Sequence, residues 1–416
     1  MGHRPTLIAS FLHFDVSFML WVLLGALGIY IAESVGLGPA QKGLMVAVPI
    51  LSGALLRMPL GLLSDRLGGK RIGTALLIFL FLPLTLGWQM GDGLPQLLAI
   101  GLMLGAAGAS FAVALPLASR WYPKERQGLV MGIAAAGNSG TVIANLLALR
   151  LAGVLGWHNV LGLAMLPLAL VLAAFLVMAK DSPAASGKAP VASATKASPG
   201  SYTAALKQAD LWWFCLFYSV TFGGYVGLSS FLPIFLRDQY QVSPVTAGYL
   251  TAAAALVGSV CRPAGGFLAD RFGGVGMLSV LLVAIGLVYA FASQLPALGI
   301  MMALLVAGMG CLGMGNGAVF QLVPQRFSRE IGLATGMVGA CGGLGGFFLP
   351  NLLGGVKEAS GSFGPGLLTL AVIAFAALAL LRGLVLAQRG WRNAWSTPAT
   401  VAPATGRVVM VPYLQA

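Results

Sequence analysis

Residues 57–69 read RMPLGLLSDRLGG, and residues 262–274 read RPAGGFLADRFGG. Each stretch opens with an arginine, reaches a glycine after three further residues, and ends in Asp-Arg, one residue and Gly-Gly. The chain of 416 residues is therefore expected to consist of two related halves. An ionised side chain inside a membrane is costly, so Arg57 and Arg262, at equivalent places in apolar segments, indicate one anion site shared by the two halves.

The composition indicates an integral membrane protein. Hydrophobic residues make up 58% of the chain and charged residues 8%, and the mean hydropathy is +0.91. The apolar runs are about 20 residues or longer, the length of a membrane-spanning helix, and the alternating pattern of barrel strands is absent. Because lipid tolerates only helices and closed barrels, we expect an all-α polytopic membrane protein.

Twelve apolar runs predict twelve transmembrane helices. Their approximate bounds are 11–31, 42–63, 71–90, 96–119, 128–151, 157–179, 211–236, 245–268, 275–293, 297–322, 332–354 and 363–386. The predicted organisation is a six-helix bundle (1–180), a polar linker rich in Ala, Ser, Pro and Lys (181–209), a second pseudo-symmetric six-helix bundle (210–390) and a polar tail (391–416). The first run is long enough to span, so no cleavable signal peptide is expected.

The net charge of +13 follows the positive-inside rule. When loops are assigned alternately to the two sides, 18 of the 24 Lys and Arg residues share a side with both termini and the linker. Four lie on the other side and two within the membrane. We therefore expect an inner (plasma) membrane protein with cytoplasmic termini, and we exclude nucleic-acid binding. The four cysteines lie in apolar runs without a CxxC pair, so neither a metal site nor a cofactor is predicted.

Arg57 and Arg262 lack a counter-ion nearby in the sequence. Asp65 and Asp270 follow them by eight residues, about 12 Å along a helix, and all eleven acids, including Asp15, are predicted at segment ends or in loops. Arginine cannot lose its proton, so an anionic substrate is the economical interpretation; snorkelling or structural pairing is the alternative. The planar guanidinium fits a flat oxyanion such as nitrate or nitrite.

The fifth and eleventh runs are rich in glycine and are expected to pack closely. They read GLVMGIAAAGNSG (128–140) and GLATGMVGACGGLGGFFLP (332–350). Asn138 is predicted to contact the substrate or to bond between helices. The candidate gating glycines are Gly132, Gly137, Gly140, Gly339, Gly342, Gly343 and Gly346.

The chain resembles a known family over nearly its whole length. The charged motif at Gly61, Asp65 and Arg66, repeated more weakly at Asp270 and Arg271 and interpreted as a turn between helices, resembles the loop signature of the major facilitator superfamily. The stretches GIAAAGNSG, GACGGLGGFFLP, GMGNGAVFQLVPQRF (313–327) and YSVTFGG (218–224) resemble the nitrate/nitrite porters of that superfamily.

The resemblance implies a carrier with two six-helix bundles that works by alternating access. It implies that Arg57 and Arg262 bind the anion, that the glycine-rich helices gate it, and that the charged motif influences the switch between states. The further binding residues implied or favoured by position are Asn138, Tyr218, Phe111, Phe222, Phe320 and Gln321. A monomer without a cofactor is expected.

Several alternatives stay open. Because no titratable group is predicted in a core helix, anion exchange is natural, but symport of nitrate with a proton is also compatible with the sequence. Another small anion, such as an organic phosphate or a carboxylate, would use the same arginines. A sensor that does not transport would keep the site. The sequence Gly-Asn-Ser-Gly at 137–140 also matches the nucleophile motif of an intramembrane serine protease, which would need His158 as its base.

Overall fold

The computed structural model describes residues 2–122, 130, 133–182, 206–327 and 331–393, and these residues form helices and connecting turns. In the first half the helices are α1 (Arg4–Trp21), α2 (Leu23–Ala26), α3 (Gly28–Val35), α4 (Pro39–Leu67), α5 (Gly69–Gln89), α6 (Leu94–Leu104), η1 (Gly105–Ser110), α7 (Phe111–Ser119), η2 (Ala136–Ser139), α9 (Gly140–Leu155), α10 (Trp157–Leu163) and α11 (Met165–Met178). In the second half they are α13 (Ala209–Tyr240), α14 (Pro244–Phe272), α15 (Gly274–Ala292), α16 (Leu298–Arg326), α17 (Ile331–Ser360), α18 (Gly364–Ala387) and α19 (Arg389–Arg392).

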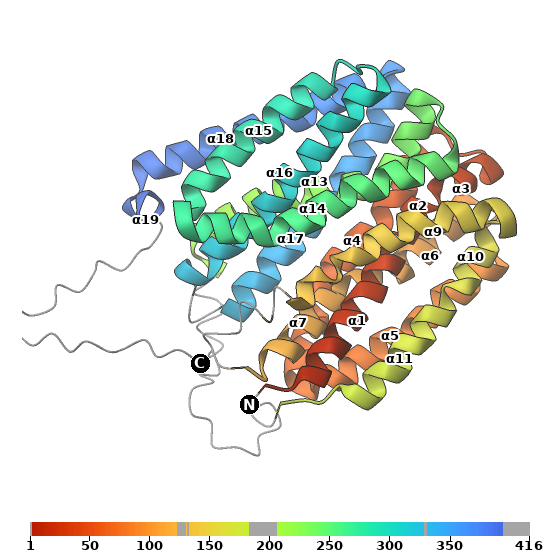
Figure 1. Cartoon of the computed structure of the whole chain (residues 1–416), viewed down its shortest axis with the longest axis horizontal. Helices are drawn as coiled ribbons and strands as arrows, with labels where there is room; N and C mark the ends of the chain where they lie inside the picture. The colour runs from red at the N-terminus through yellow and green to blue at the C-terminus, as the bar shows by residue number, and fades with distance from the viewer. Residues whose placement is uncertain (1, 123–129, 131–132, 183–205, 328–330, 394–416) are drawn as a thin grey trace, which may run out of the picture.

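These helices confirm the predicted polytopic membrane fold. In the described part of the chain, 11 helices are long and apolar enough to cross a membrane. The first crossing is α1 to α3, interrupted only at Val22 and Leu27, and it completes the predicted twelve. The two halves lie side by side as bundles (Figure 1). The predicted linker and tail fall largely outside the described residues, and the domain boundaries therefore stay predictions.

Close backbone packing joins the two bundles. An added Cβ at Gly43 of α4 would lie 2.4 Å from the carbonyl oxygen of Pro350 in α17, and one at Gly248 of α14 would lie 2.5 Å from the carbonyl oxygen of Asn145 in α9. Small residues at these points let helices from opposite halves touch through their backbones.

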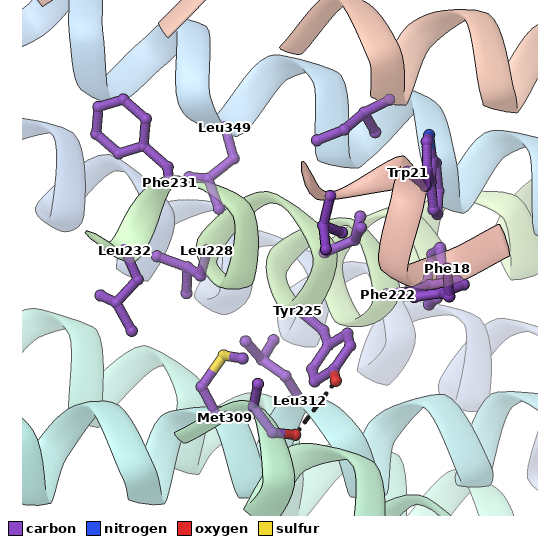
Figure 2. Packing of buried hydrophobic residues seen from close by; sticks show 14 of the residues in the cluster. Phe18, Trp21, Phe222, Tyr225, Leu228, Phe231, Leu232, Met309, Leu312 and Leu349 are labelled. Carbon is purple, nitrogen blue, oxygen red and sulfur yellow. Dashed lines mark hydrogen bonds between the residues drawn. The ribbon is translucent and has the colours of Figure 1, made fainter. Parts of the chain in front are cut away.

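Helix α13 runs through the middle of the packed interior. Of its most apolar 18-residue window, 94% is buried. Figure 2 shows Tyr225 and Leu228 of α13 on the side of Met309 and Leu312 in α16, while Trp21 of α1 lies on the other side of α13. The hydroxyl of Tyr225 donates to the carbonyl of Ala255 at 3.2 Å.

The repeated charged motif forms the ends of two helices, and its interpretation as a charged turn is corrected here. Asp65 and Arg66 lie in the last turn of α4, and Asp270 and Arg271 occupy the same place in α14. A single glycine makes each turn: Gly68 has φ 97° and Gly273 has φ 87°, values that only glycine adopts readily. Each helix therefore continues through the Asp-Arg pair and ends at the glycine.

Ion pairs hold the halves together at one end. We call the end where α1 begins the α1 end, and the other the opposite end. At the opposite end Lys42 pairs with Asp238 at 2.7 Å and Arg237 with Glu33 at 3.2 Å; both pairs join the first half to the second. At the α1 end the ion pairs of the described residues stay within one half: they are Arg120–Asp65 and Arg326–Asp210.

Candidate anion-binding site

Arg57 is buried inside the molecule, with 1% of its surface exposed. Its Nε donates to the carbonyl of Gly108 at 3.0 Å, and its Nη1 donates to the carbonyl of Gly339, which belongs to the other half. Its Nη2 is buried and has no hydrogen-bond partner. The guanidinium therefore spans the two halves and keeps one donor nitrogen free.

A short 3₁₀ segment presents the Gly108 carbonyl to Arg57. Segment η1 interrupts the fourth crossing between α6 and α7, and such segments inside a longer helix often mark functional positions. Gly108 also makes room for an aromatic ring, because an added Cβ there would lie 2.3 Å from the indole of Trp21.

Three aromatic rings surround the Arg57 guanidinium. Its Cζ lies 5.2 Å from the ring centroid of Trp21, 5.3 Å from that of Phe111 and 5.2 Å from that of Phe222. The rings come from α1, α7 and α13. Cation–π attraction offsets part of the cost of burying the charge without supplying a negative partner. Phe111 and Phe222 were predicted at the site, whereas Trp21 was missed.

Arg262 of α14 approaches from the second half. Its Nη2 donates to the hydroxyl of Tyr218 at 3.2 Å, and its Cζ lies 5.8 Å from the ring centroid of Phe320. Its Nη1 is buried without a hydrogen-bond partner. The second guanidinium, like the first, keeps a free donor in an aromatic environment.

Aromatic contacts connect the two arginines. Tyr218 stacks on Phe222, with centroids 5.0 Å apart and planes 4° apart, so Phe222 contacts both Arg57 and the partner of Arg262. Phe111 and Phe320 meet edge to face at 6.2 Å. Both guanidiniums therefore contact one continuous cluster of aromatic rings. The structure thus brings together six predicted residues: Arg57, Arg262, Tyr218, Phe111, Phe222 and Phe320.

Two predicted binding residues do not join these contacts. The amide oxygen of Gln321 points to the start of α15, where it would lie 2.4 Å from a Cβ added at Gly274. Neighbouring helical residues diverge by about 100°, so Phe320 and Gln321 face different directions. Asn138 lies in η2 with 2% exposure, and its Oδ1 has no hydrogen-bond partner. The described hydrogen bonds of the two arginines go to Gly108, Gly339 and Tyr218, not to Asn138.

The candidate gating glycines of α17 make close contacts around the site. The carbonyl of Gly339 accepts from Arg57. An added Cβ would lie 2.4 Å from the Tyr218 ring at Gly342, 2.7 Å from Ala54 at Gly343 and 2.4 Å from Val226 at Gly346. In the fifth crossing, Gly137 and Gly140 pack on α1, and Gly132 lies outside the described residues.

Asp15 lies deep in α1, and its predicted place at a segment end is wrong. The helix begins at Arg4, eleven residues earlier, so Asp15 is inside the spanning segment. Its Oδ1 accepts a hydrogen bond from the hydroxyl of Ser139 at 2.6 Å. His158 lies at the opposite end, 3.9 Å from Asp92. Ser139 and His158 are therefore separated, which removes the basis for the serine-protease alternative.

A polytopic helical membrane protein with an arginine from each half at its centre fits the class of secondary carriers. The family model of the Major Facilitator Superfamily matches residues 9–350, and the chain belongs to this superfamily of transporters, which are not enzymes. Within it, the chain groups with the nitrate/nitrite porters, as the following relatives show.

A protein of Bacillus subtilis named "Nitrite extrusion protein" is 35% identical over 365 residues, covering 88% of this chain and 90% of its own. A "Probable nitrate transporter NarT" of Staphylococcus haemolyticus is 32% identical over 361 residues, which cover 86% of this chain and 90% of that protein. A crystal structure of a bacterial homolog of the human lysosomal transporter Spinster superposes with a TM-score of 0.70 at 21% identity, covering 94% of this chain and 97% of that one. The last similarity supports the fold.

Proposed function

We propose that the protein transports nitrate, and also nitrite, across the membrane, and that Arg57 and Arg262 hold the anion together. The observation that carries the proposal is the pair of free donors: one Nη of each guanidinium is buried without a partner. Buried donors without an acceptor cost free energy, and two cations without a counter-ion repel each other. One anion with several oxygens would satisfy both donors and neutralise part of the charge.

The surroundings of the arginines favour a small, flat anion. The side chains that pack on the guanidiniums are mainly aromatic: Phe111, Phe222, Phe320 and Trp21 present rings to them. A carrier of organic phosphates or carboxylates would need more donors or a wider site. Two relatives named for nitrite extrusion and nitrate transport support the same choice.

Transport would proceed by alternating access between the two halves. We propose that the α1 end faces the cytoplasm, as the distribution of Lys and Arg predicts, and that the protein acts as a monomer. The ion pairs at the opposite end would then close the outer side in this state. Exchange of nitrate for nitrite and symport of nitrate with a proton are both compatible with the two arginines.

Counterflow in proteoliposomes tests the proposal. Vesicles containing the purified protein are loaded with unlabelled nitrate, nitrite, acetate or a sugar phosphate, and entry of labelled nitrate is followed. We expect rapid entry only with internal nitrate or nitrite. Equal stimulation by the organic anions, or entry no faster than in protein-free vesicles, would contradict the proposal.

A further inference from the structure

Asp15 is an acid inside a membrane-spanning helix, and the two-arginine site gives it no role. It lies eleven residues after the start of α1, about 16 Å along the helix axis. Its side chain is neither fully buried nor fully exposed. An acid at this depth is costly and is a functional candidate by default.

Phe14, the residue before Asp15 in α1, packs against the wall of the anion site. The ring of Phe14, the preceding residue, meets the ring of Phe111 at 5.9 Å. Phe111 in turn lies 5.3 Å from the guanidinium carbon of Arg57. The carboxylate is therefore attached beside a residue that packs on the wall of the site.

Asp15 also contacts the glycine-rich segment of the fifth crossing. Its carboxylate accepts from Ser139 at 2.6 Å. An added Cβ at Gly137 would lie 2.9 Å from the backbone nitrogen of Asp15, and one at Gly140 would lie 2.0 Å from its backbone oxygen. Because α1 and η2 touch through their backbones here, Asp15 lies at the contact between the first and fifth crossings.

No basic side chain among the described residues forms an ion pair with Asp15. On α1 itself, the neighbouring His13 faces α5 and α11, where its Nε2 lies 3.1 Å from the Gly73 carbonyl oxygen and its ring meets Phe175.

Among the described residues, the elements packed on α1 give the carboxylate hydrogen-bond donors, the Ser139 hydroxyl and the Gly140 backbone, but no ion pair. Segments η1, η2, α2 and α11 contain no ionisable side chain. The charged side chains of the other packed elements are Lys42, Arg57, Asp65 and Arg66 of α4, Lys70 and Arg71 of α5, Arg120 after α7 and Arg150 of α9. Of these, Arg57 contacts the ring of Phe111, which in turn contacts Phe14, the residue before Asp15.

We infer that Asp15 is the residue that binds the coupling proton, so that the protein carries nitrate together with a proton. The inference rests on the proposed function. The carboxylate accepts one proton from water on one side of the membrane and returns it to water on the other side after the halves have switched.

Electrostatics couples the two ligands. A proton on Asp15 removes one negative charge from the bundle that holds Arg57, so the two-arginine site attracts an anion more strongly. By thermodynamic linkage, a bound anion then favours the protonated carboxyl to the same extent. Nitrate and the proton therefore enter together. A purely structural contact would not need the charge, because an uncharged side chain could accept the same hydrogen bond from Ser139 without the cost of burying an ion.

The variant Asp15→Asn separates the two roles. Its amide oxygen can still accept from Ser139, but it cannot take up a proton. In proteoliposomes we expect the wild type to accumulate labelled nitrate in empty vesicles under an inward proton gradient, and we expect Asp15→Asn to lose at least roughly tenfold of this uptake while it keeps nitrate/nitrite counterflow. Ser139→Ala, the matched control, loses the hydrogen bond but keeps the titratable group, and it should retain proton-driven uptake.

Calorimetry of nitrate binding gives a second readout in the purified protein. In the wild type, the heat of binding should vary with the ionisation enthalpy of the buffer, because a proton is taken up with nitrate, and affinity should rise as the pH falls. In Asp15→Asn both dependences should vanish. Asp15→Ser serves as a second neutral variant if Asp15→Asn does not fold.

The outcomes distinguish the inference from the proposed function. Unchanged proton-driven uptake in a neutral variant would overturn the inference, and so would equal loss of uptake and counterflow in folded protein. Wild-type counterflow without any proton-driven uptake into empty vesicles would overturn the inference alone. Absence of nitrate binding and counterflow in the wild type would overturn the proposed function itself.

Discussion

Arg57 and Arg262 reach the centre of the molecule with different partners. Arg57 uses two of its nitrogens on backbone carbonyls, from Gly108 and Gly339, whereas Arg262 uses one on the Tyr218 hydroxyl. Each keeps one buried Nη without a hydrogen-bond partner. The fixed fork of the guanidinium makes this division possible, because its donors point in different directions from one planar group.

Replacing either arginine by lysine is therefore expected to impair transport although the charge is kept. A lysine ammonium cannot reach a carbonyl and an anion with the same fork geometry. Loss of one charge-assisted hydrogen bond corresponds to roughly 10- to 100-fold. Uptake by Arg57→Lys and Arg262→Lys should fall by at least this factor, with unchanged yield and thermal stability. Arg382→Lys, at an exposed position of α18, is the control, and normal uptake in either site variant would argue against the site.

Trp21 and Asp15 show why sequence alone described the site incompletely. Both lie in α1, which begins at Arg4, well before the apolar run from which the first crossing was predicted. Asp15 was therefore placed near an interface instead of beside the site wall. A tryptophan in an apolar run is usually a packing residue, and only the three-dimensional contact between Trp21 and Arg57 distinguishes it.

At the scale of elements, apolar length predicted the crossings, whereas local irregularities were not predictable. The 3₁₀ segments η1 and η2 interrupt the fourth and fifth crossings at glycine-containing stretches, and they supply the Gly108 carbonyl and the Ser139 hydroxyl. Composition signals that small residues pack closely, but it does not say where hydrogen bonding changes from the α to the 3₁₀ pattern. The direction of Gln321, likewise, depends on the rotation of α16.

The candidate gating glycines are expected to differ in their tolerance of an added methyl group. An added Cβ at Gly140 would lie 2.0 Å from the Asp15 backbone oxygen, whereas one at Gly339 would lie 3.5 Å from its nearest neighbour, the Phe111 ring. Gly140→Ala must therefore separate α1 from the fifth crossing, with a cost of about 1 to 3 kcal/mol, while Gly339→Ala should be close to neutral for stability. Thermal unfolding in detergent checks this pair, and equal melting temperatures would show that the contact at Gly140 relaxes freely.

For the whole molecule, the ion pairs indicate that the structure is closed at the opposite end. Lys42–Asp238 and Arg237–Glu33 join the halves at the opposite end, and the amide of Ala40 donates to Glu358 across the same boundary at 2.9 Å. All three contacts must break before the halves can separate at that end. Ion pairs that keep contact with solvent contribute little individually, so together these contacts can bias the carrier without locking it.

Neutralising two of these contacts should shift the population toward opening at the opposite end. In a chain whose four cysteines have been replaced, spin labels at Gln41 and Gln241 would report the distance between the halves there, since both positions are exposed at that end. We expect the combined Lys42→Gln and Glu33→Gln variant to add a longer-distance population. Arg326→Gln, which breaks a pair within one half, should leave the distribution unchanged. An unaltered distribution in the combined variant would mean that the pairs do not hold this state.

The claim that one anion is shared by two halves is tested most directly by a double-mutant cycle on nitrate binding. Affinity is measured calorimetrically for the wild type, Arg57→Lys, Arg262→Lys and the double variant. If both guanidiniums hold the same anion, the wild type binds one nitrate per chain, each single variant loses most of the affinity, and the double variant loses much less than the sum of the single losses. Additive losses, or normal affinity in either single variant, would contradict a shared site.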